Sequence, residues 1–323
     1  MNNKIKDINI GVSIYSMTAA YTSRLLTFDE CVKKAADMGY EGIEIVAPQS
    51  VPGYPYPPEA WCDNFRRMMS DYNLTPICYG TYVDPGRRSD RYPTPEEIIR
   101  DTMNDMMVAK SLGFKYVRTL HEFGAETYYR MLPFCEKLDM KLVIELHNPH
   151  NPRTPKWQEY FEVMARPECK DYLGVNLDMG VMQKKPTYQT IVRAVKAGAR
   201  EEKVEEIINA ISNGVPESEL GDLNPAEKNL AAQGYYRVSN SATLEEIDMI
   251  MPYTLYIHGK FYHINEDLEE TCIPYDEIIK ILDRYNYKGW VSSEFEGHDP
   301  SIPMDFEPQL NRFRDMFKKY LAE

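Results

Sequence analysis

The sequence predicts a closed barrel of eight parallel strands, each followed by a helix, in a single domain that spans residues 1–323. Two observations lead to this fold class. Short apolar segments typical of buried parallel strands alternate with helical segments eight times along the chain. The length of 323 residues also fits a barrel of about 250 residues plus one insertion.

The first half of the chain supplies four of the strand–helix units. Thr27 and Glu30 form a capping-box pattern at the start of the first helix, and Pro95 stands at the first position of the third helix. Gly39 and Gly113 follow helical segments as stop signals. The expected strands are 9–15, 42–46, 75–79 and 115–120, and the expected helices are 28–38, 60–72, 94–112 and 126–138.

The second half supplies the other four units and one interruption. About sixty residues, 179–241, separate the sixth strand from the next regular helix. Three stretches of helical composition, separated by glycines, lie within this segment, at 188–196, 201–213 and 225–233. We expect a helical insertion on the barrel face where the sixth strand ends. The remaining expected strands are 141–147, 173–178, 254–258 and 288–293, and the remaining helices are 157–165, 244–251, 275–285 and 306–320.

An open, doubly wound parallel sheet is the main alternative fold. It predicts a glycine-rich phosphate-binding turn directly after the first strand. Residues 16–21 (SMTAAY), which occupy that position, contain no glycine. The prediction is therefore a (β/α)8 TIM barrel with a helical insertion after strand six.

Composition and charge exclude several classes of function. A net charge of −13 would repel nucleic-acid phosphates, so we expect no nucleic-acid partner. No apolar stretch approaches the roughly 20 residues that cross a bilayer, and residues 1–7 (MNNKIKD) lack the apolar core of a secretory signal. The six cysteines include no Cys-x-x-Cys pair, which is typical of reduced thiols. These features predict a cytoplasmic protein without membrane association.

Four successive predicted strands end on a residue that can bind a metal. These residues are Glu145, Asp178, His258 and Glu294. The carboxyl ends of barrel strands meet at one face, where such barrels hold their active sites. Three carboxylates packed there would repel one another without a cation, although a single strand-end carboxylate is more often a helix cap or an ion-pair partner. We therefore predict one hard divalent ion, Mn²⁺, Mg²⁺ or Co²⁺, at this set of residues.

His147 and Lys260 are the candidate catalytic residues. His147 lies two residues after Glu145, so both side chains point the same way if the strand continues. It is either a general base or acid, or a histidine bonded to a loop carbonyl. Lys260 follows His258 by two residues, and it either stabilises an oxyanion or lies at the rim of the barrel.

Other polar residues near strand ends are candidates for substrate binding. They are Tyr15, Arg118, His121 and Glu296. Glu44, in contrast, lies inside the second strand. A buried carboxylate there needs a partner, and we expect a structural ion pair with Arg118.

The residues around these positions resemble a known family. Residues 36–45 (ADMGYEGIEI) are similar to the second-strand signature of the xylose isomerase-like barrels, the sugar-phosphate isomerase/epimerase superfamily. Four further segments, each with one proposed ligand, resemble its metal-binding segments: 144–147 (IELH), 175–178 (VNLD), 257–260 (IHGK) and 291–294 (VSSE). The resemblance implies a metal-dependent enzyme that acts on a sugar.

Within this superfamily, the long insertion and the IHGKF segment resemble the large subunit of bacterial C-glycoside deglycosidases. That resemblance implies a complex with a small β-rich subunit, and cleavage of the C–C bond of 3-oxo-C-glucosides through an enolate. The metal would act as a Lewis acid at the ketone oxygen, and His147 would take the proton at C2.

Two alternatives remain open. The first is a ketose 3-epimerase or an inosose dehydratase-like enzyme, in which an enolate also forms but the carbon skeleton stays intact. In the epimerases, Glu145 and Glu294 would exchange the proton. The second is a sugar-binding barrel without catalytic activity, which predicts no tightly bound metal and no proton exchange at a ketose carbon.

Overall fold

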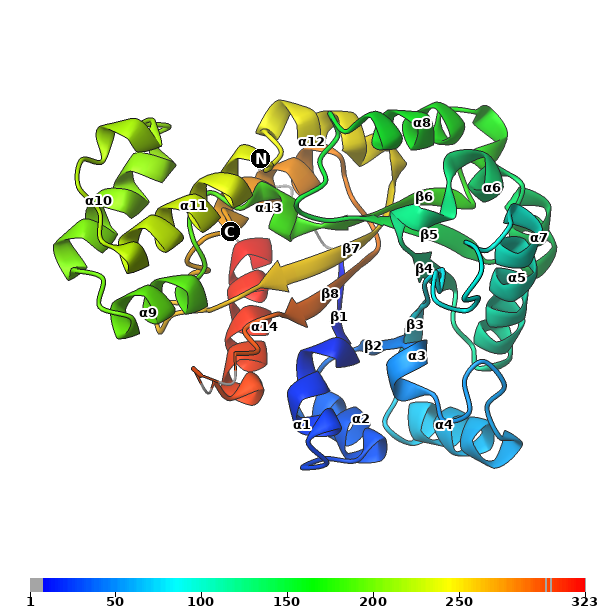
Figure 1. Cartoon of the computed structure of the whole chain (residues 1–323). Helices are drawn as coiled ribbons and strands as arrows, with labels where there is room; N and C mark the ends of the chain where they lie inside the picture. Colours follow the sequence, from blue (N-terminus) through cyan, green and yellow to red (C-terminus); the bar gives the residue numbers. More distant parts are fainter. Residues whose placement is uncertain (1–7, 300, 303, 323) are drawn as a thin grey trace.

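A computed structural model of the chain describes residues 8–299, 301–302 and 304–322. Its eight strands are parallel, pair in chain order and close into a barrel through the pairing of β8 with β1. Figure 1 shows this barrel with helices around it. The (β/α)8 TIM barrel expected from the sequence is confirmed. The strands are β1 (Asn9–Ser13), β2 (Gly42–Val46), β3 (Thr75–Gly80), β4 (Tyr116–Thr119), β5 (Lys141–Leu146), β6 (Leu173–Asp178), β7 (Thr254–Phe261) and β8 (Trp290–Phe295).

Amphipathic helices cover the outside of the barrel. The capping boxes expected at Thr27 and Thr94 are present, each closed by the glutamate three residues later. The helices are α1 (Thr18–Thr22), α2 (Phe28–Asp37), α3 (Ala47–Ser50), α4 (Glu59–Asp71), α5 (Pro95–Ser111), α6 (Ala125–Tyr129), α7 (Leu132–Leu138), α8 (Pro155–Met164), α12 (Leu244–Ile250), α13 (Tyr275–Arg284) and α14 (Phe306–Ala322). Short 3-10 turns are η1 (Ile14–Met17), η2 (His121–Phe123), η3 (Pro167–Cys169), η4 (Met179–Met182), η5 (Glu217–Glu219) and η6 (Met251–Tyr253).

The apolar core has two parts that matter for the site. A large cluster fills the space between the strands and the surrounding helices, with fully buried residues such as Leu142 and Ile144 of β5. A separate small cluster contains Cys78, Val143 and Tyr256, from three different strands. The hydroxyl of Tyr256 donates a hydrogen bond to the buried carboxylate of Glu44. The small cluster therefore forms an apolar layer beneath polar residues inside the barrel.

Several expected elements differ in their limits from the observed ones, among them one helix and one strand. The helix expected over 126–138 is divided into α6 and α7, because Pro133 in the first turn of α7 cannot continue a helix through the carbonyl of Tyr129. Strand β7 continues to Phe261, three residues beyond the expected end at His258. Lys260 is therefore a strand residue and not a loop residue.

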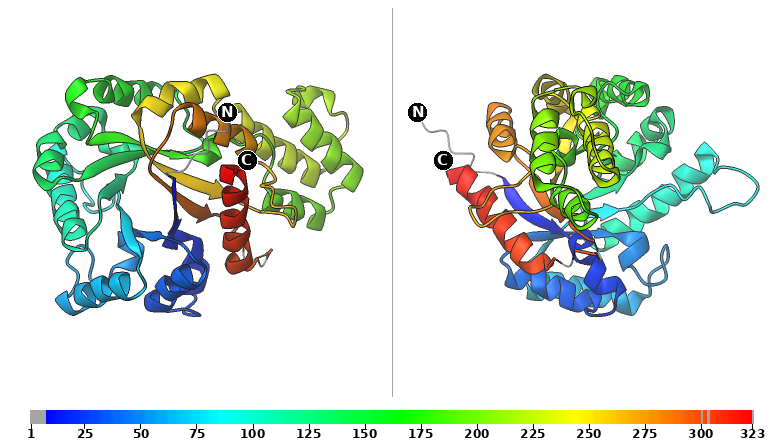
Figure 2. Two further views of the ribbon diagram at one scale, coloured as in Figure 1. Left: turned by 180° about the vertical axis from the view of Figure 1, so that it is seen from behind. Right: turned by 60° about the vertical axis from the view of Figure 1, so that its left-hand side comes forward.

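Helices α9 (Tyr188–Lys196), α10 (Glu201–Ser212) and α11 (Pro225–Ser239) lie between β6 and α12 and form a lobe at one side of the barrel (Figures 1 and 2). The lobe has its own apolar cluster, which includes Ile207, Ile211 and Leu230. Helix α11 runs past its expected end at residue 233 through Gly234. A Cβ atom on Gly234 would lie 2.5 Å from Ile211 Cδ1, so the glycine allows α11 to pack closely on α10.

Two further expectations concern the chain as a whole. In the part of the chain that the structure describes, no helix combines the length and the apolar character that crossing a membrane requires. All six cysteines are buried and free.

Candidate metal centre

The four side chains expected to bind a metal meet at the carboxyl ends of β5 to β8. Glu145, Asp178, His258 and Glu294 are buried, and one ligand atom from each lies within 4.8 Å of the others. The strand register explains this arrangement, because Asp178 pairs with His258 between β6 and β7, and Glu294 pairs with Lys260 between β7 and β8. The convergence expected from the sequence is present, and metal binding itself remains a prediction.

These residues fit a hard divalent ion. Asp178 Oδ2 and Glu294 Oε2 are buried and accept no hydrogen bond of good geometry, although Lys260 Nζ forms ion pairs with them at 3.1 and 2.7 Å. Both oxygens therefore keep lone pairs available for a cation. Three carboxylates and one imidazole form the oxygen-rich donor set that Mn²⁺ and Mg²⁺ prefer over sulfur.

The carboxylates around the imidazole of His258 favour its protonated form. Its Nδ1 lies 2.9 Å from Glu145 Oε1 and 3.3 Å from Glu294 Oε2. Burial lowers the pKa of His258, but the carboxylates of Glu294, Glu44 and Glu145 outweigh burial and raise the pKa well above its usual value. A bound divalent ion would supply this positive charge and would need the neutral imidazole as ligand.

Asp178 shows the electrostatic cost of the cluster most clearly. Burial raises the pKa of this carboxyl to about 6; Lys260 opposes the shift, whereas Glu294 and Glu145 add to it. The carboxylate is therefore held towards its protonated form by its surroundings. A divalent cation beside Asp178 would reverse this effect, because an adjacent positive charge stabilises the ionised form.

A second set of buried groups orients the cluster from below. Glu44 Oε2 lies 2.8 Å from His258 Nε2 and accepts a 2.6 Å hydrogen bond from the Tyr256 hydroxyl. Arg118 forms ion pairs with Glu145 Oε2 at 3.0 Å and with Glu44 Oε1 at 3.4 Å. A carboxylate on the outer nitrogen of a metal-binding histidine fixes the ring and turns the other nitrogen towards the metal.

Sequence reasoning missed this role of Glu44. The expected pair with Arg118 exists, but the shorter contact of Glu44 is with His258. The available signal was a carboxylate flanked by Ile43 and Ile45 in a strand buried throughout, which places the charge inside the barrel. Arg118, assigned to substrate binding, is also buried, and both of its ion pairs are with carboxylates of this network.

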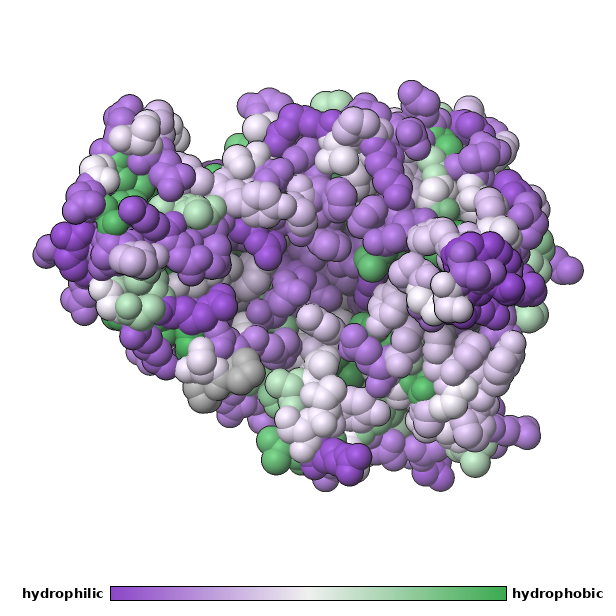
Figure 3. All heavy atoms as spheres, viewed as in Figure 1, coloured by the Kyte–Doolittle hydropathy of each residue, from purple (hydrophilic) through white to green (hydrophobic). Residues whose placement is uncertain are grey.

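A cavity of about 800 Å³ lies above the cluster. Figure 3 shows a hollow with mainly hydrophilic residues at the centre of this face, beside the lobe of α9 to α11. Of the remaining residues assigned to catalysis or substrate binding, Tyr15, His147, Lys260 and Glu296 line the cavity. His121 is not among the described lining residues; it lies in η2, where its ring contacts that of His150 at a centroid distance of 4.1 Å, with the two planes tilted by 53°.

The structure shows the loop carbonyl contact that one interpretation of His147 expects, and its role as a general base or acid remains a prediction. His147 lines the cavity, and its Nδ1 lies 2.8 Å from the backbone oxygen of Asn148. Because a carbonyl oxygen can only accept, we assign the ring proton to Nδ1. Nε2 is then the nitrogen that would act as a base.

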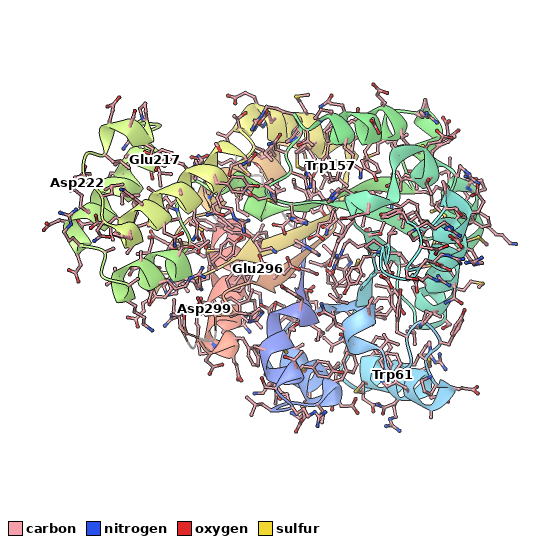
Figure 4. All side chains as sticks on the ribbon, viewed as in Figure 1. Trp61, Trp157, Glu217, Asp222, Glu296 and Asp299 are labelled. Atoms are coloured by element: carbon pink, nitrogen blue, oxygen red, sulfur yellow. The ribbon has the colours of Figure 1, made fainter. Side chains whose placement is uncertain are left out.

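Lys260 lies inside the site and not at the rim, because β7 extends past it. Its Nζ also donates a 2.9 Å hydrogen bond to Glu296 Oε2. Tyr15 donates to the other oxygen of Glu296 at 3.5 Å. Figure 4 shows Glu296 near the centre of this face, by the ends of β7 and β8, whereas Glu217 and Asp222 lie at the outer edge of the lobe.

Replacement of Asp178 by alanine should abolish metal binding. The purified wild-type chain should contain about one Mn²⁺-like ion per chain by elemental analysis, since one set of four ligands is available. Asp299→Asn is the matched control, because Asp299 lines the same cavity outside the cluster. Full metal content in Asp178→Ala would show that the ligand assignment is wrong.

Replacement of Glu44 by glutamine should weaken metal binding without removing any proposed ligand. The loss of an outer carboxylate on a metal-binding histidine typically lowers metal affinity by about 10- to 100-fold. Competition with a fluorescent chelator measures the affinity, and circular dichroism checks that the variant folds. An affinity equal to that of the wild type would exclude an orienting role for Glu44.

Comparisons with known proteins agree with this fold. The 3'-dehydrocarminate deglycosidase alpha subunit of Microbacterium sp. is 29% identical over 313 residues, which cover 89% of this chain and 88% of the relative. The C-glycoside deglycosidase alpha subunit of Arthrobacter globiformis is 29% identical over 302 residues, covering 90% of this chain and 85% of the relative. A solved D-allulose 3-epimerase from Methylomonas sp. has the same fold, with a TM-score of 0.57 and 12% identity over 98% of both chains.

The family assignment rests on a match that spans most of the barrel. The model of the xylose isomerase-like TIM barrel family matches residues 32–319, from the first long helix to the last. The chain belongs to the xylose isomerase-like TIM barrel family.

Proposed function

We propose that this chain is the catalytic subunit of a divalent-metal-dependent lyase that cleaves the C–C bond of 3-oxo-C-glucosides through an enolate. The observation that carries the proposal is that His147 lines the same cavity as a buried set of possible metal ligands. The two relatives named above are both deglycosidase alpha subunits, which supports the same reaction.

The residues of the cavity fit the first step, the formation of an enolate. When bound at the cluster, a divalent ion would polarise the ketone oxygen of the sugar as a Lewis acid. His147 follows the proposed ligand Glu145 by two residues, so a ketone placed at the cluster brings its neighbouring C2 proton towards His147. His147 Nε2 would take that proton. Lys260, whose ammonium lies among the carboxylates, would stabilise the negative charge that develops on the oxygen.

The second step releases the aromatic group. The electron pair of the enolate forms a double bond between C1 and C2, and the bond from C1 to the aryl carbon breaks. The aryl carbon receives a proton, which protonated His147 can return, so that the enzyme regains its starting state. A phenol-bearing ring is required, because only such a ring accepts a proton at this carbon readily. Tyr15 and Glu296, which also line the cavity, would hold sugar hydroxyl groups.

An epimerase acting on a free ketose is the second candidate. Glu145 and Glu294 both belong to the cluster and could exchange a proton on opposite faces of a ketose. In that reaction His147 has no necessary role, whereas it is required in the proposed lyase. The position of His147 in the wall of the cavity therefore favours the lyase.

We also propose a partner and a compartment. Both relatives are named as alpha subunits, which supports a hetero-oligomer. We propose as partner the small β-rich subunit that the sequence resemblance implies. Mn²⁺ is the first choice of metal, with Mg²⁺ and Co²⁺ as alternatives, on the basis of the donor set. Six free, buried cysteines are compatible with a reducing compartment such as the cytoplasm.

Replacement of His147 by alanine should abolish proton exchange at C2 while metal content stays at the wild-type level. The loss of a general base typically lowers the rate by about 10² to 10⁴-fold. Exchange is measured by NMR as deuterium incorporation into methyl 3-oxo-β-glucopyranoside in D₂O. His150→Gln is the control, because His150 is on the same loop but is not among the described residues that line the cavity. Unchanged exchange in His147→Ala would rule out His147 as the base.

A substrate comparison separates the lyase from the alternatives. The chain, produced together with the protein encoded by the neighbouring reading frame and loaded with Mn²⁺, should release the aglycone from a 3-oxo-C-glucoside and leave D-fructose unchanged. Chromatography of both reactions gives the result. Epimerisation of the ketose without aglycone release would establish the epimerase, and no reaction with either compound would indicate a binding protein.

A further inference from the structure

Helix α11 of the lobe forms part of the cavity wall. Gln233, Tyr236 and Arg237 line the cavity and share one face of the helix, because residues three and four positions apart lie side by side. The Tyr236 ring is 57% exposed, so an aromatic surface faces open space beside the cavity. Together these residues offer an amide, a flat ring and a guanidinium group, none of which is used by the proposed chemistry at C2 and C3.

Arg237 differs from the other cations of the cavity. Four cationic side chains line it: Arg118, Arg193, Lys260 and Arg237. The first three each form an ion pair with a carboxylate, at distances of 3.0, 3.2 and 2.7 Å respectively. The guanidinium of Arg237 has no carboxylate within ion-pair distance among the described residues. Among the described residues, its side chain donates one hydrogen bond, of 3.5 Å, to the neutral amide of Asn148.

The absence of a carboxylate partner is informative in this chain. The net charge is −13, with 50 acidic residues against 37 lysines and arginines, so acidic groups are abundant. Arg193, which lies on α9 of the same lobe, forms an ion pair with Asp299. Arg237 therefore presents a planar donor group to the cavity with its charge available for a ligand.

The position of Arg237 relative to His147 is fixed by the backbone. Asn148 Nδ2 donates a 3.0 Å hydrogen bond to the carbonyl oxygen of Arg237. Asn151 Nδ2 donates a 3.1 Å hydrogen bond to the carbonyl oxygen of Asn240. Both asparagines are buried, with exposures of 7% and 6%. The end of α11 is thus bound to the loop that carries His147, and a ligand that reaches His147 also lies close to Arg237.

The burial of the residues along the cavity indicates the direction in which a substrate lies. Glu145 in the metal-binding set is buried, His147 is half-buried, and Arg237 is exposed at the mouth. In a 3-oxo-C-glucoside, C3, C2 and C1 follow one another, and C1 carries the aromatic aglycone. With the C3 ketone at the cluster and C2 at His147, the aglycone extends past C1 towards the mouth, where α11 lies.

We propose that Arg237 binds an anionic group, a carboxylate or an ionised phenol, on the aromatic aglycone and makes the enzyme selective for acidic aglycones. The inference rests on the proposed function, because that function sets the direction of the substrate. Tyr236 offers a flat surface for the aromatic ring, and Gln233 offers a hydrogen bond beside it. Arginine suits this role because its two parallel N–H groups match the two oxygens of a carboxylate.

A pair of ligands that differ only in charge tests the proposal. We choose 3-C-glucosyl-4-hydroxybenzoate, which carries a carboxylate, and its neutral methyl ester. Neither has a ketone, so neither is turned over, and equilibrium binding to the Mn²⁺-loaded complex can be measured by calorimetry. The acid should bind the wild type at least about tenfold more tightly than the ester, a difference of about 1.4 kcal/mol.

Three variants locate the source of this preference. Arg237→Gln should reduce the ratio of the two affinities to near one, and Arg237→Lys should keep part of it, because lysine retains the charge without the planar pair of donors. Arg193→Gln is the matched control and should keep the wild-type ratio. A wild-type ratio near one, or an unchanged ratio in Arg237→Gln, would overturn the proposal. Weaker association with the partner subunit in Arg237→Gln, with the ratio unchanged, would do the same and would assign Arg237 to the subunit interface.

The proposed function and this inference can fail separately. Deuterium exchange at C2 of methyl 3-oxo-β-glucopyranoside by the wild-type complex requires no aglycone, so it tests the proposed function alone. Exchange without discrimination between acid and ester would contradict only the role of Arg237. Discrimination without exchange would support a binding site for anionic aryl glycosides and would contradict the lyase reaction.

Discussion

The need to balance three buried carboxylates at one end of the barrel governs the rest of this structure. Glu145, Asp178 and Glu294 are brought together by the closure of the barrel, away from water that would screen their charges. The chain itself supplies three side chains that can carry positive charge, Arg118, His258 and Lys260, in direct contact with these oxygens. A divalent ion provides the same charge in a smaller volume, and it would free the lysine to act on a substrate.

The interior of the barrel is built in layers to support this cluster. An apolar layer around Tyr256 lies lowest, and its hydroxyl joins it to a layer of buried charge formed by Glu44 and Arg118. Glu44 fixes the ring of His258, and Arg118 holds Glu145. Because each buried charge touches an opposite one, removal of either partner would leave an uncompensated charge, which is far more destabilising than loss of the pair. The same contacts that compensate the buried charges thus hold the ligand atoms in place.

Much of the fold and the site could be predicted because their signals are local. Apolar strands with Glu145, Asp178 or Glu294 at or next to their carboxyl ends predict a parallel sheet. They also indicate the face of the barrel where these strand ends meet. The contact between Glu44 on β2 and His258 on β7 could not be predicted, because it crosses the barrel and depends on which strands face each other. The position of Lys260 stayed open for a related reason: the length of β7 is set by its pairing with β8, and not by its own sequence.

In the proposed function, the lobe contributes to substrate selectivity, whereas the metal-binding cluster contributes to the chemistry. Its own apolar core makes it a separate packing unit, and its hydrogen bonds to the loop after β5 fix one of its helices beside His147. Variation in the lobe can therefore change which substrates enter without disturbing the charges beneath.

Anomalous X-ray diffraction at the manganese edge, on crystals of the Mn²⁺-loaded protein, tests the central claim most directly. Our account requires one peak at the carboxyl ends of β5 to β8, within bonding distance of Glu145, Asp178, His258 Nδ1 and Glu294. A peak elsewhere would contradict it. A fully Mn²⁺-loaded protein that shows no peak at these strand ends, with Lys260 still among the carboxylates, would contradict it as well.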